Sequence, residues 1–441
     1  MKKASFYNLY FTDSNQSYVF NTLTSALIKI PSEVADFLSA NNLNEIPDEM
    51  CASLSQRGIV VDSSMDESRY FEYYYNLRQY GHGEELFVVI LPTYSCNLRC
   101  TYCYQGKNAK TGHMGEKETH AVLQFIKTQI EQNKRVLKSL KVVFFGGEPL
   151  VCKELVIQMA NEIRQIANKS GLAFYSSIIT NATLVDQDVI DRLIRPNSMT
   201  LQVSIDGNRI SHDKKRIDAC GNGTYDIILS ALKRIAKSGL ARNVILRINI
   251  DKTNCSDIES VLQEFSSVVG RFYFGRLRPD GSYGCNAELC MTIDEYQTNC
   301  LPKIRLLASK YPIDRSGRQF GKMHPCGFNK RSVYIVDPFL DVYKCDGLVG
   351  IAKFSVGKIS CDGQLLKNDN YFLQATWSPF RHSKCMQCKW LPICAGGCPY
   401  NGYLKTHNVD VPYCGITEEL VVKDLLAMVR GETQSIAQDI M

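Results

Sequence analysis

Three cysteines stand close together in the first third of the chain, at Cys96, Cys100 and Cys103. Three thiolates in one short loop suit a [4Fe–4S] cube and leave its fourth iron without a protein ligand. Such an iron is open to a substrate or a cofactor. Zinc is the alternative, but it would require a further ligand nearby to close its site.

A second group of cysteines lies in the C-terminal region. It comprises Cys385, Cys388, Cys394, Cys398 and Cys414, and it is preceded by Cys326 and Cys345. This spacing is also typical of metal ligands, and the alternative to further iron–sulfur clusters is a zinc knuckle with spare thiols. Two groups at the two ends of a long middle segment indicate two kinds of site on one chain.

The composition narrows the class of protein. With 18 cysteines in 441 residues, the chain has too few for a small disulfide scaffold and too many for a routine enzyme. The N-terminus has no signal-peptide pattern, and the longest apolar run, Leu86–Leu91, is far shorter than the about 20 residues that span a bilayer. We therefore expect a cytoplasmic chain with reduced thiols and no membrane partner. A net charge of +6 is too mild for a nucleic-acid-binding surface.

Apolar runs alternate with amphipathic segments from Glu85 onward, which predicts an α/β fold with a parallel sheet, open or curled into a barrel. The predicted strands are Leu86–Leu91, Val142–Phe145, Phe174–Ile179, Leu201–Ile205, Val244–Ile250 and Phe272–Phe274. The predicted helices between them are Glu116–Gln132, Glu154–Lys169, Val185–Leu193, Tyr225–Ser238 and Asp257–Val268. From about Gly281 the alternation fades, and a loop-dominated region is expected before a last helix, Thr417–Arg430.

Polar and glycine residues follow the predicted strands. Cys96 comes after the first strand, Gly146–Glu148 after the second, Thr180–Asn181 after the third and Asp206–Gly207 after the fourth. In α/β folds the loops at the carboxyl ends of parallel strands build the active site. The sequence therefore predicts that these residues share one site.

At this point the chain resembles the radical S-adenosylmethionine (SAM) enzymes. The resemblance rests on CxxxCxxC with Tyr102 before its third cysteine, on the GGEP motif in Phe144–Pro149, and on Thr180–Thr183 and Ser204–Gly207. It implies a partial (β/α)6 barrel over about residues 85–280. It also implies that the open iron chelates the methionyl group of SAM, and that one electron from a donor such as flavodoxin or ferredoxin yields a 5′-deoxyadenosyl radical.

The residue types at the strand ends fit such a cofactor. Gly146 and Gly147 lack a Cβ and so allow close approach to the backbone, and Glu148 can accept from a cationic amine. Tyr102 offers an apolar face for adenine. The remaining candidate contacts with SAM are Asn181, Ser204, Asp206 and Arg247. The alternatives are tight turns for the glycines, local caps for Ser204 and Asp206, and a sheet-face ion pair for Arg247.

The C-terminal cysteines resemble the seven-cysteine SPASM extension of radical SAM peptide and protein modifiers. The resemblance implies two auxiliary [4Fe–4S] clusters, and so three clusters in all. Its outer cluster would be held by Cys385, Cys388, Cys394 and Cys414, and its inner cluster by Cys326, Cys345 and Cys398. Leu340 stands where the family pattern has a glycine, which is expected to alter a turn more than the ligand set.

The inner cluster lacks a fourth ligand in this assignment, and two explanations remain open. An upstream thiol such as Cys285, Cys290 or Cys300 reaches in, or the iron stays open and binds a substrate thiolate; His324 is a remote third option. Asp346 follows Cys345 directly, as in anaerobic sulfatase-maturating enzymes, where this Asp is the proposed catalytic base. The alternative for Asp346 is a turn residue before Gly347.

The N-terminal 80 residues are predicted to form a small α+β unit that resembles the winged-helix-like recognition elements of peptide maturases. Such elements bind a leader peptide as an added strand; the alternative is a packing domain without a partner. The expected organisation is a peptide-recognition domain (1–80), a radical SAM core (81–280), a bridging region (281–320) and a loop-rich SPASM domain (321–441).

The predicted function is maturation of a ribosomally made precursor peptide by formation of a thioether or carbon–carbon cross-link. The first alternative is an anaerobic sulfatase-maturating enzyme that makes formylglycine. An iron–sulfur electron carrier or a peptide-binding protein without radical chemistry is the alternative from another class.

Overall fold

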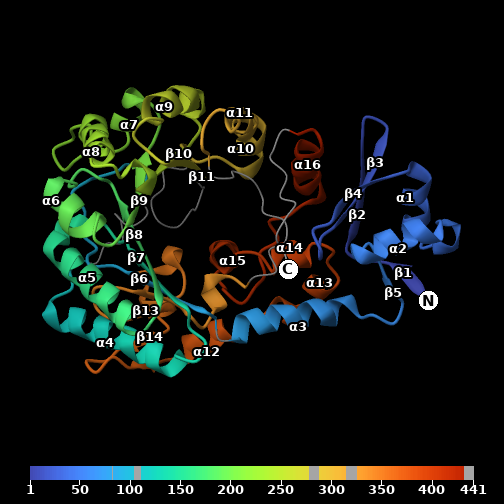
Figure 1. Ribbon diagram of the computed structural model, residues 1–441, viewed down its shortest axis with the longest axis horizontal. Coiled ribbons are helices and arrows are strands. Elements are labelled where there is room, and N and C mark those ends of the chain that lie inside the picture. Colours follow the sequence, from blue (N-terminus) through green and yellow to red (C-terminus); the bar gives the residue numbers. More distant parts are fainter. Residues whose placement is uncertain (82, 104–110, 278–287, 314–324, 432–441) are drawn as a thin grey trace. The chain divides into compact units, whose positions relative to one another are not determined.

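The computed structural model describes residues 1–81, 83–103, 111–277, 288–313 and 325–431 (Figure 1). The chain forms two compact units that do not follow sequence order. One unit comprises Met1–Gly81, Gly317–Lys330 and Thr376–Met441, and the other comprises His82–Ser316 and Arg331–Ala375. The segment 331–375 was expected to belong with the C-terminal cysteines, but it lies in the same unit as the predicted barrel.

The larger unit contains six adjacent parallel strands, and helices cover their outer side (Figure 1). In chain order the strands are β6 (Glu85–Ile90), β7 (Ser139–Phe144), β8 (Ala173–Thr180), β9 (Thr200–Ile205), β10 (Val244–Ile250) and β11 (Arg271–Arg276). The principal helices between them are α4 (Glu116–Asn133), α5 (Lys153–Lys169), α8 (Tyr225–Lys237) and α9 (Ile258–Phe265). The predicted α/β class and all six predicted strands are confirmed.

Strands β9 and β10 alternate along their length between a buried face and a partly open face, which explains their period of two. On β10, Leu246, Ile248 and Ile250 are buried in the main core, whereas Arg247 and Asn249 between them are only half buried. The buried face packs on apolar residues of the covering helices, such as Phe125 of α4. The polar residues of the strands therefore face away from the helices.

The same sheet continues beyond β6 through four short strands, in the order β6-β12-β13-β14-β15. They are β12 (Val333–Val336), β13 (Asp341–Tyr343), β14 (Gly357–Ile359) and β15 (Leu365–Lys367). The expectation of a loop-dominated region was wrong here, because these strands have three or four residues and carry little periodic signal. Leu340 lies in the turn between β12 and β13 with φ +67°, and its side chain is buried.

The smaller unit joins the two ends of the chain. Its N-terminal part has a sheet of β2 (Asn8–Asp13), β3 (Gln16–Asn21) and β4 (Leu27–Ile30), a strand pair of β1 (Lys2–Ala4) and β5 (Val60–Asp62), and helices α1 (Ser32–Ser39), α2 (Asp48–Gln56) and α3 (Glu67–Tyr80). Its C-terminal part has helices α13 (Ser383–Met386), α14 (Leu391–Cys394), α15 (Pro399–Thr406) and α16 (Glu418–Val429).

Side chains from both ends of the chain share apolar cores in this unit. Leu9 and Phe20 cluster with Val421 and Leu425 of α16, and a second cluster contains Cys385 together with aromatic residues of the N-terminal part. Thr22 Oγ1 also donates to the carbonyl of Lys389, at 2.5 Å. The N-terminal segment is therefore part of the support of the C-terminal cysteines. Across the described ranges, none of the helices combines the length and the hydropathy needed to cross a bilayer.

Candidate active site

The loop with the first three cysteines leaves the end of β6 and is held between two other backbone segments. The amides of Arg99 and Thr101 donate to the carbonyls of Ile217 (2.7 Å) and Lys215 (2.9 Å). On the other side, the amide of Glu148 donates to the carbonyl of Ser95 at 2.9 Å. The carboxyl ends of β6, β7 and β9 thus converge on this loop, as the sequence predicted.

Gly146 and Gly147 allow two backbones to touch. A Cβ on Gly146 would lie 2.4 Å from the carbonyl oxygen of Thr93, and one on Gly147 would lie 2.2 Å from that of Ser95. These contacts are too short for any side-chain atom, and Gly146 also has φ +128°. The neighbour that requires glycine here is the cysteine loop, and not a ligand as expected from the sequence.

Glu148 is fully buried and connects two strand ends. Its Oε1 accepts from the amide of Leu150 (3.0 Å) and the hydroxyl of Thr180 (2.8 Å), and its Oε2 accepts from the amide of Asn181 (2.7 Å). Burial raises the pKa of this carboxyl, and the three donors oppose that shift. In the structure Glu148 therefore positions the end of β8, and acceptance from a SAM amine stays a prediction.

Asn181 reaches back to the cysteine loop. Its Nδ2 donates to Oδ1 of Asn97 at 2.9 Å and lies 3.8 Å from the sulfur of Cys96. Its Oδ1 accepts from the amide and the hydroxyl of Thr183, at 3.0 and 2.7 Å. The third predicted strand end thus meets the first cysteine directly.

Tyr102 is the centre of a polar network at the ends of β9 and β10. Its hydroxyl donates to Oδ2 of Asp206, and it accepts from Nη1 of Arg216 at 2.8 Å and from Nδ2 of Asn249 at 3.2 Å. Nδ2 of Asn249 also lies 3.0 Å from Oδ1 of Asp206. The predicted candidates Tyr102 and Asp206 are therefore in contact, and the tyrosine ring is fixed by its hydroxyl.

Arg216 is a functional candidate that was not predicted from the sequence. Its side chain is 10% exposed, and Nη1 lies 4.0 Å from Oδ2 of Asp206. Burial raises the pKa of Cys100, and the charge of Arg216 opposes that rise. Within the described residues its Nε is buried and has no hydrogen-bond acceptor. The only available signal was a basic run after Asp206–Gly207, and charged residues in a loop are normally exposed.

A short turn after β10 supports this network. Nδ2 of Asn254 donates to the carbonyls of Asp206 (3.0 Å) and Asn249 (2.8 Å), and the buried ammonium of Lys215 pairs with the buried carboxylate of Asp251. His212 accepts from the amide of Asp206 through Nδ1 at 3.3 Å, and burial lowers its pKa to about 4. Asn254 and His212 thus hold the backbone of Asp206 in place.

Ser204 and Arg247, two further predicted contacts with SAM, are direct neighbours across β9 and β10. Arg247 donates through Nε to Oδ1 of Asn249 at 2.8 Å, and its guanidinium lies 5.5 Å from the ring centroid of Tyr273. Instead of the sheet-face ion pair considered for Arg247, the structure shows this cation–π contact and this hydrogen bond to the side-chain amide of Asn249. Their roles toward SAM stay predictions.

The residues of this site fit an iron–sulfur cluster and SAM. Burial raises the pKa of Cys96 and raises that of Cys100 to about 11, and the three thiols of the loop are electrostatically coupled. Thiols in such a setting become thiolates when a metal binds them. The unmet N–H of Arg216 leaves one donor for a carboxylate or hydroxyl group of a ligand. When bound, the cluster and SAM would supply one-electron cleavage of a carbon–sulfur bond.

Four of the C-terminal thiols gather in the smaller unit. Cys394 is electrostatically coupled to Cys385, Cys388 and Cys414, and burial raises the pKa of Cys385 and of Cys394 to about 11. The loop Ala395–Gly397 that follows Cys394 has positive φ throughout, and the amide of Tyr413 donates to Gly396 at 3.0 Å. This is the set predicted for the outer cluster. Among the described residues, no group of three or more His, Cys, Asp or Glu side chains is arranged to hold a metal ion. The ligand sets therefore stay predictions.

The predicted inner set is divided between the units, with Cys326 and Cys398 in the smaller and Cys345 in the larger. Asp346 begins a short 3₁₀ turn after β13, and its carboxylate is exposed at the protein surface. Oδ1 of Asp346 lies 3.8 Å from the sulfur of Cys345. Its role as a base stays a prediction.

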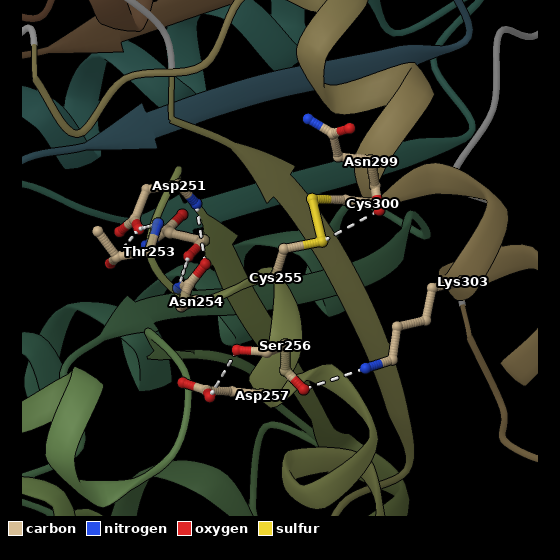
Figure 2. Close-up of a disulfide and its surroundings, with 10 residues drawn as sticks. Asp251, Thr253, Asn254, Cys255, Ser256, Asp257, Asn299, Cys300 and Lys303 are labelled. Carbon is tan, nitrogen blue, oxygen red and sulfur yellow. Dashed lines mark hydrogen bonds between the residues drawn. A yellow bond between two sulfur atoms is a disulfide. The ribbon is translucent and has the colours of Figure 1, made fainter.

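Two of the proposed upstream ligands are already bonded. Cys300 forms a disulfide with Cys255 (Figure 2), and Cys290 is disulfide-bonded as well. The expectation of reduced thiols is therefore wrong for these cysteines, and neither Cys290 nor Cys300 has a free thiol for the inner cluster. Cys285 and His324 lie outside the described residues.

Known proteins share this fold and parts of this sequence. Residues 90–265 match the model of the Radical SAM superfamily. The cysteine-type anaerobic sulfatase-maturating enzyme of Clostridium perfringens (strain 13 / Type A) is 24% identical over 343 residues, which cover 71% of this chain and 88% of that protein. The serine-type enzyme of Klebsiella aerogenes is 22% identical over 327 residues, which cover 69% of this chain and 77% of that protein.

Two solved structures share this fold. The histidine-tagged enzyme anSMEcpe with bound AdoMet has a TM-score of 0.59 at 20% identity and covers 78% of this chain and 98% of its own. Streptococcus suis SuiB bound to its precursor peptide SuiA has a TM-score of 0.59 at 14% identity and covers 95% of this chain and 100% of its own.

The match to the superfamily model begins at the end of β6 and contains the cysteine loop, the GGEP segment and the ends of β8 and β9. Residues 90–265 of this chain form a Radical SAM domain, and the chain has the fold of anSMEcpe and SuiB. The sequence-based recognition of the family is confirmed.

Proposed function

We propose that this enzyme modifies a residue of a peptide or protein, and that the modification is a thioether cross-link in a ribosomally made precursor peptide. Cys96, Cys100 and Cys103 would hold the cluster that binds SAM. Tyr102, Asp206, Asn249 and Arg216 would orient SAM beside it. Support comes from the names of the relatives, which act on sulfatases, and from SuiB, whose structure contains a precursor peptide.

A precursor peptide is favoured as the substrate because more of this chain matches SuiB than matches anSMEcpe. SuiB covers 95% of this chain, whereas anSMEcpe covers 78%. The additional strands and helices of residues 1–80 share their core with α16, and we propose that this segment binds the leader part of the precursor. A carbon–carbon cross-link is the alternative product for the same substrate class.

Conversion of Cys or Ser to formylglycine in a sulfatase is the second candidate. The pair Cys345–Asp346 and the sequence relatives favour it. In that reaction the exposed carboxylate of Asp346 would take a proton from the substrate. Both candidates need an external one-electron donor, for which we propose flavodoxin or ferredoxin, and both need the two auxiliary clusters as electron acceptors.

Mass spectrometry of the product separates the candidates. The reconstituted enzyme is incubated without oxygen with SAM, dithionite and either a short Cys-containing peptide encoded beside its gene or a peptide with a sulfatase motif. A thioether forms with loss of two hydrogen atoms and retention of sulfur, whereas Cys loses its sulfur when it becomes formylglycine. Release of 5′-deoxyadenosine without a mass change in either peptide would contradict the proposal.

A further inference from the structure

Helix α3 of the smaller unit carries apolar side chains on two opposite faces (Figure 1). On one face Phe71 and Tyr75 are fully buried and share a core with Cys385. The other face is exposed. Its large side chains, which we term the α3 stripe, are Tyr70, Tyr73, Tyr74, Leu77 and Tyr80. A surface helix normally has one apolar and one polar face, so the second apolar face indicates a second contact.

The α3 stripe is one continuous patch. Its residues are three or four positions apart, and side chains at these spacings are neighbours on a helix surface. The ring centroids of Tyr70 and Tyr74 lie 4.7 Å apart, and those of Tyr73 and Tyr74 lie 5.2 Å apart. The members of the stripe are between 38% and 59% exposed. At about 150–250 Å² for a whole aromatic side chain, the stripe offers roughly 350–550 Å² of surface, the size at which apolar patches are often functional.

The spacing along the α3 stripe is the same in both directions. Tyr70, Tyr73, Leu77 and Tyr80 are separated by three, four and three positions. Paired helices interlock their side chains at this spacing. If a second copy of α3 lies antiparallel across a two-fold axis at the level of residue 75, Tyr73 faces Leu77 of the second copy. Tyr70 then faces Tyr80 of the second copy, so the stripe is complementary to itself.

The size and the support of the α3 stripe also fit such a pair. Two stripes would bury roughly 700–1,100 Å², which reaches the about 1,000 Å² that a specific interface needs. The helix is fixed from its buried side, because Gln79 Nε2 donates to the carbonyl of Trp377 at 2.8 Å and Asn329 Nδ2 donates to the hydroxyl of Tyr75 at 2.9 Å. A surface that is already ordered loses less entropy on association. An antiparallel pair also places the two helix dipoles in opposite directions.

We propose that the α3 stripe is the interface of a homodimer, in which α3 pairs antiparallel with α3 of a second copy. Tyrosine suits a surface that is exposed in the monomer and covered in the dimer, since its ring is apolar and its hydroxyl binds water. The small area predicts a weak dimer, with a dissociation constant of about 10 μM. Because the buried face of α3 shares its core with Cys385, pairing would also stabilise the segment predicted to hold the outer cluster.

Sedimentation velocity of the full-length, reconstituted enzyme at about 1–100 μM measures this association. The wild type should change from monomer to dimer within that range. Tyr73→Glu and Leu77→Lys each place a charge against an apolar side chain, and each should weaken the dimer at least about tenfold. In the double variant the two new charges face each other across the antiparallel interface, so it should dimerise again.

Two control variants change the same residue types on exposed positions of the larger unit. They are Tyr175→Glu and Leu306→Lys, at side chains that are 57% and 72% exposed, and both should dimerise as the wild type does. Circular dichroism checks that each variant is folded. Recovery of the dimer in the double variant separates a lost interface from a misfolded chain, because two added charges would not repair a folding defect.

Three results would overturn the inference. The first is a wild type that stays monomeric at every concentration, and the second is a dimer that survives both single substitutions. The third is a double variant that stays monomeric, which rejects the antiparallel two-fold arrangement. If the wild type is monomeric and Tyr73→Glu instead weakens binding of the precursor peptide, the α3 stripe belongs to the substrate. The inference does not depend on the proposed function, since association is measured without SAM or peptide.

Discussion

Replacement of Glu148 by Gln tests what the carboxylate of the GGEP motif does. In the structure its two oxygens accept three hydrogen bonds, two at Oε1 and one at Oε2 from the amide of Asn181 at 2.7 Å. Glutamine retains one oxygen, which can keep the first two. Its amide nitrogen must then face the N–H of Asn181, and two donors meet in a fully buried place.

The expected cost follows from these contacts. Loss of one hydrogen bond to a charged acceptor costs about 1.5–3 kcal/mol, and a buried donor left unmet costs about 1–3 kcal/mol. Removal of a buried charge offsets part of this, because burial raises the pKa of Glu148 and so already disfavours the ionised form. We expect a net loss of about 2–4 kcal/mol in the free energy of unfolding.

Urea denaturation of wild type and variant measures this loss, and equilibrium binding of SAM to the reconstituted protein is measured beside it. Glu131→Gln is the control, since Glu131 is 70% exposed and its loss should change stability by less than about 0.5 kcal/mol. An unchanged unfolding midpoint together with lost SAM binding would refute the positioning role. It would support direct contact of Glu148 with SAM instead.

Four further outcomes are expected. The pKa of His212 falls from 6.5 to about 4 on folding, so between these pH values the unfolded chain binds a proton that the folded chain does not. The free energy of unfolding should therefore drop by up to about 3 kcal/mol as the pH falls from 6.5 to 4. His212→Gln should abolish this pH dependence in urea titrations. Leu340→Gly relieves about 1–2 kcal/mol of left-handed strain but removes a buried side chain worth about 2–5 kcal/mol, so we expect a lower unfolding midpoint; a higher one would mean that strain dominates. Gly147→Ala should cost about 1–3 kcal/mol by overpacking and displace the cysteine loop, seen as a weaker iron–sulfur absorbance after reconstitution. The disulfide between Cys255 and Cys300 closes a loop with a sequence separation of 45, so Cys300→Ser should cost about 4 kcal/mol, and equal midpoints for wild type and variant without reductant would contradict this.

Much of the barrel could be predicted because its signals are local. A strand that is buried on one face against helices must be apolar at alternate positions, and a helix that covers it must be apolar every three to four residues. Val244–Ile250 was predicted with the bounds that β10 has. The cysteine motif, GGEP and Asp206 stand at strand ends that converge, since parallel strands place their carboxyl ends at one edge.

The residues alone could not indicate partners that lie far apart in the chain. The sheet continues from β6 to β12, more than 240 residues later, and strands this short are specified by pairing more than by pattern. The burial of Arg216 depends on Tyr102 and Asp206, and a basic residue in a loop carries no sign of it. The shared core of Leu9 and Leu425 likewise arises only when the two ends of the chain meet.

The sequence by itself determined the chemistry of this protein, because ligand type and spacing are properties of short segments. It predicted thiols as ligands of an iron–sulfur cluster, and it placed glycines and polar groups at successive strand ends. Only the tertiary structure decided the use of those groups. The glycines allow the cysteine loop to pack against their backbone, and Glu148 holds the end of β8 by hydrogen bonds. Cys300 forms a disulfide with Cys255 and so has no free thiol for a cluster. These roles depend on which atoms meet across the fold, and such contacts are set by packing of distant segments rather than by local pattern.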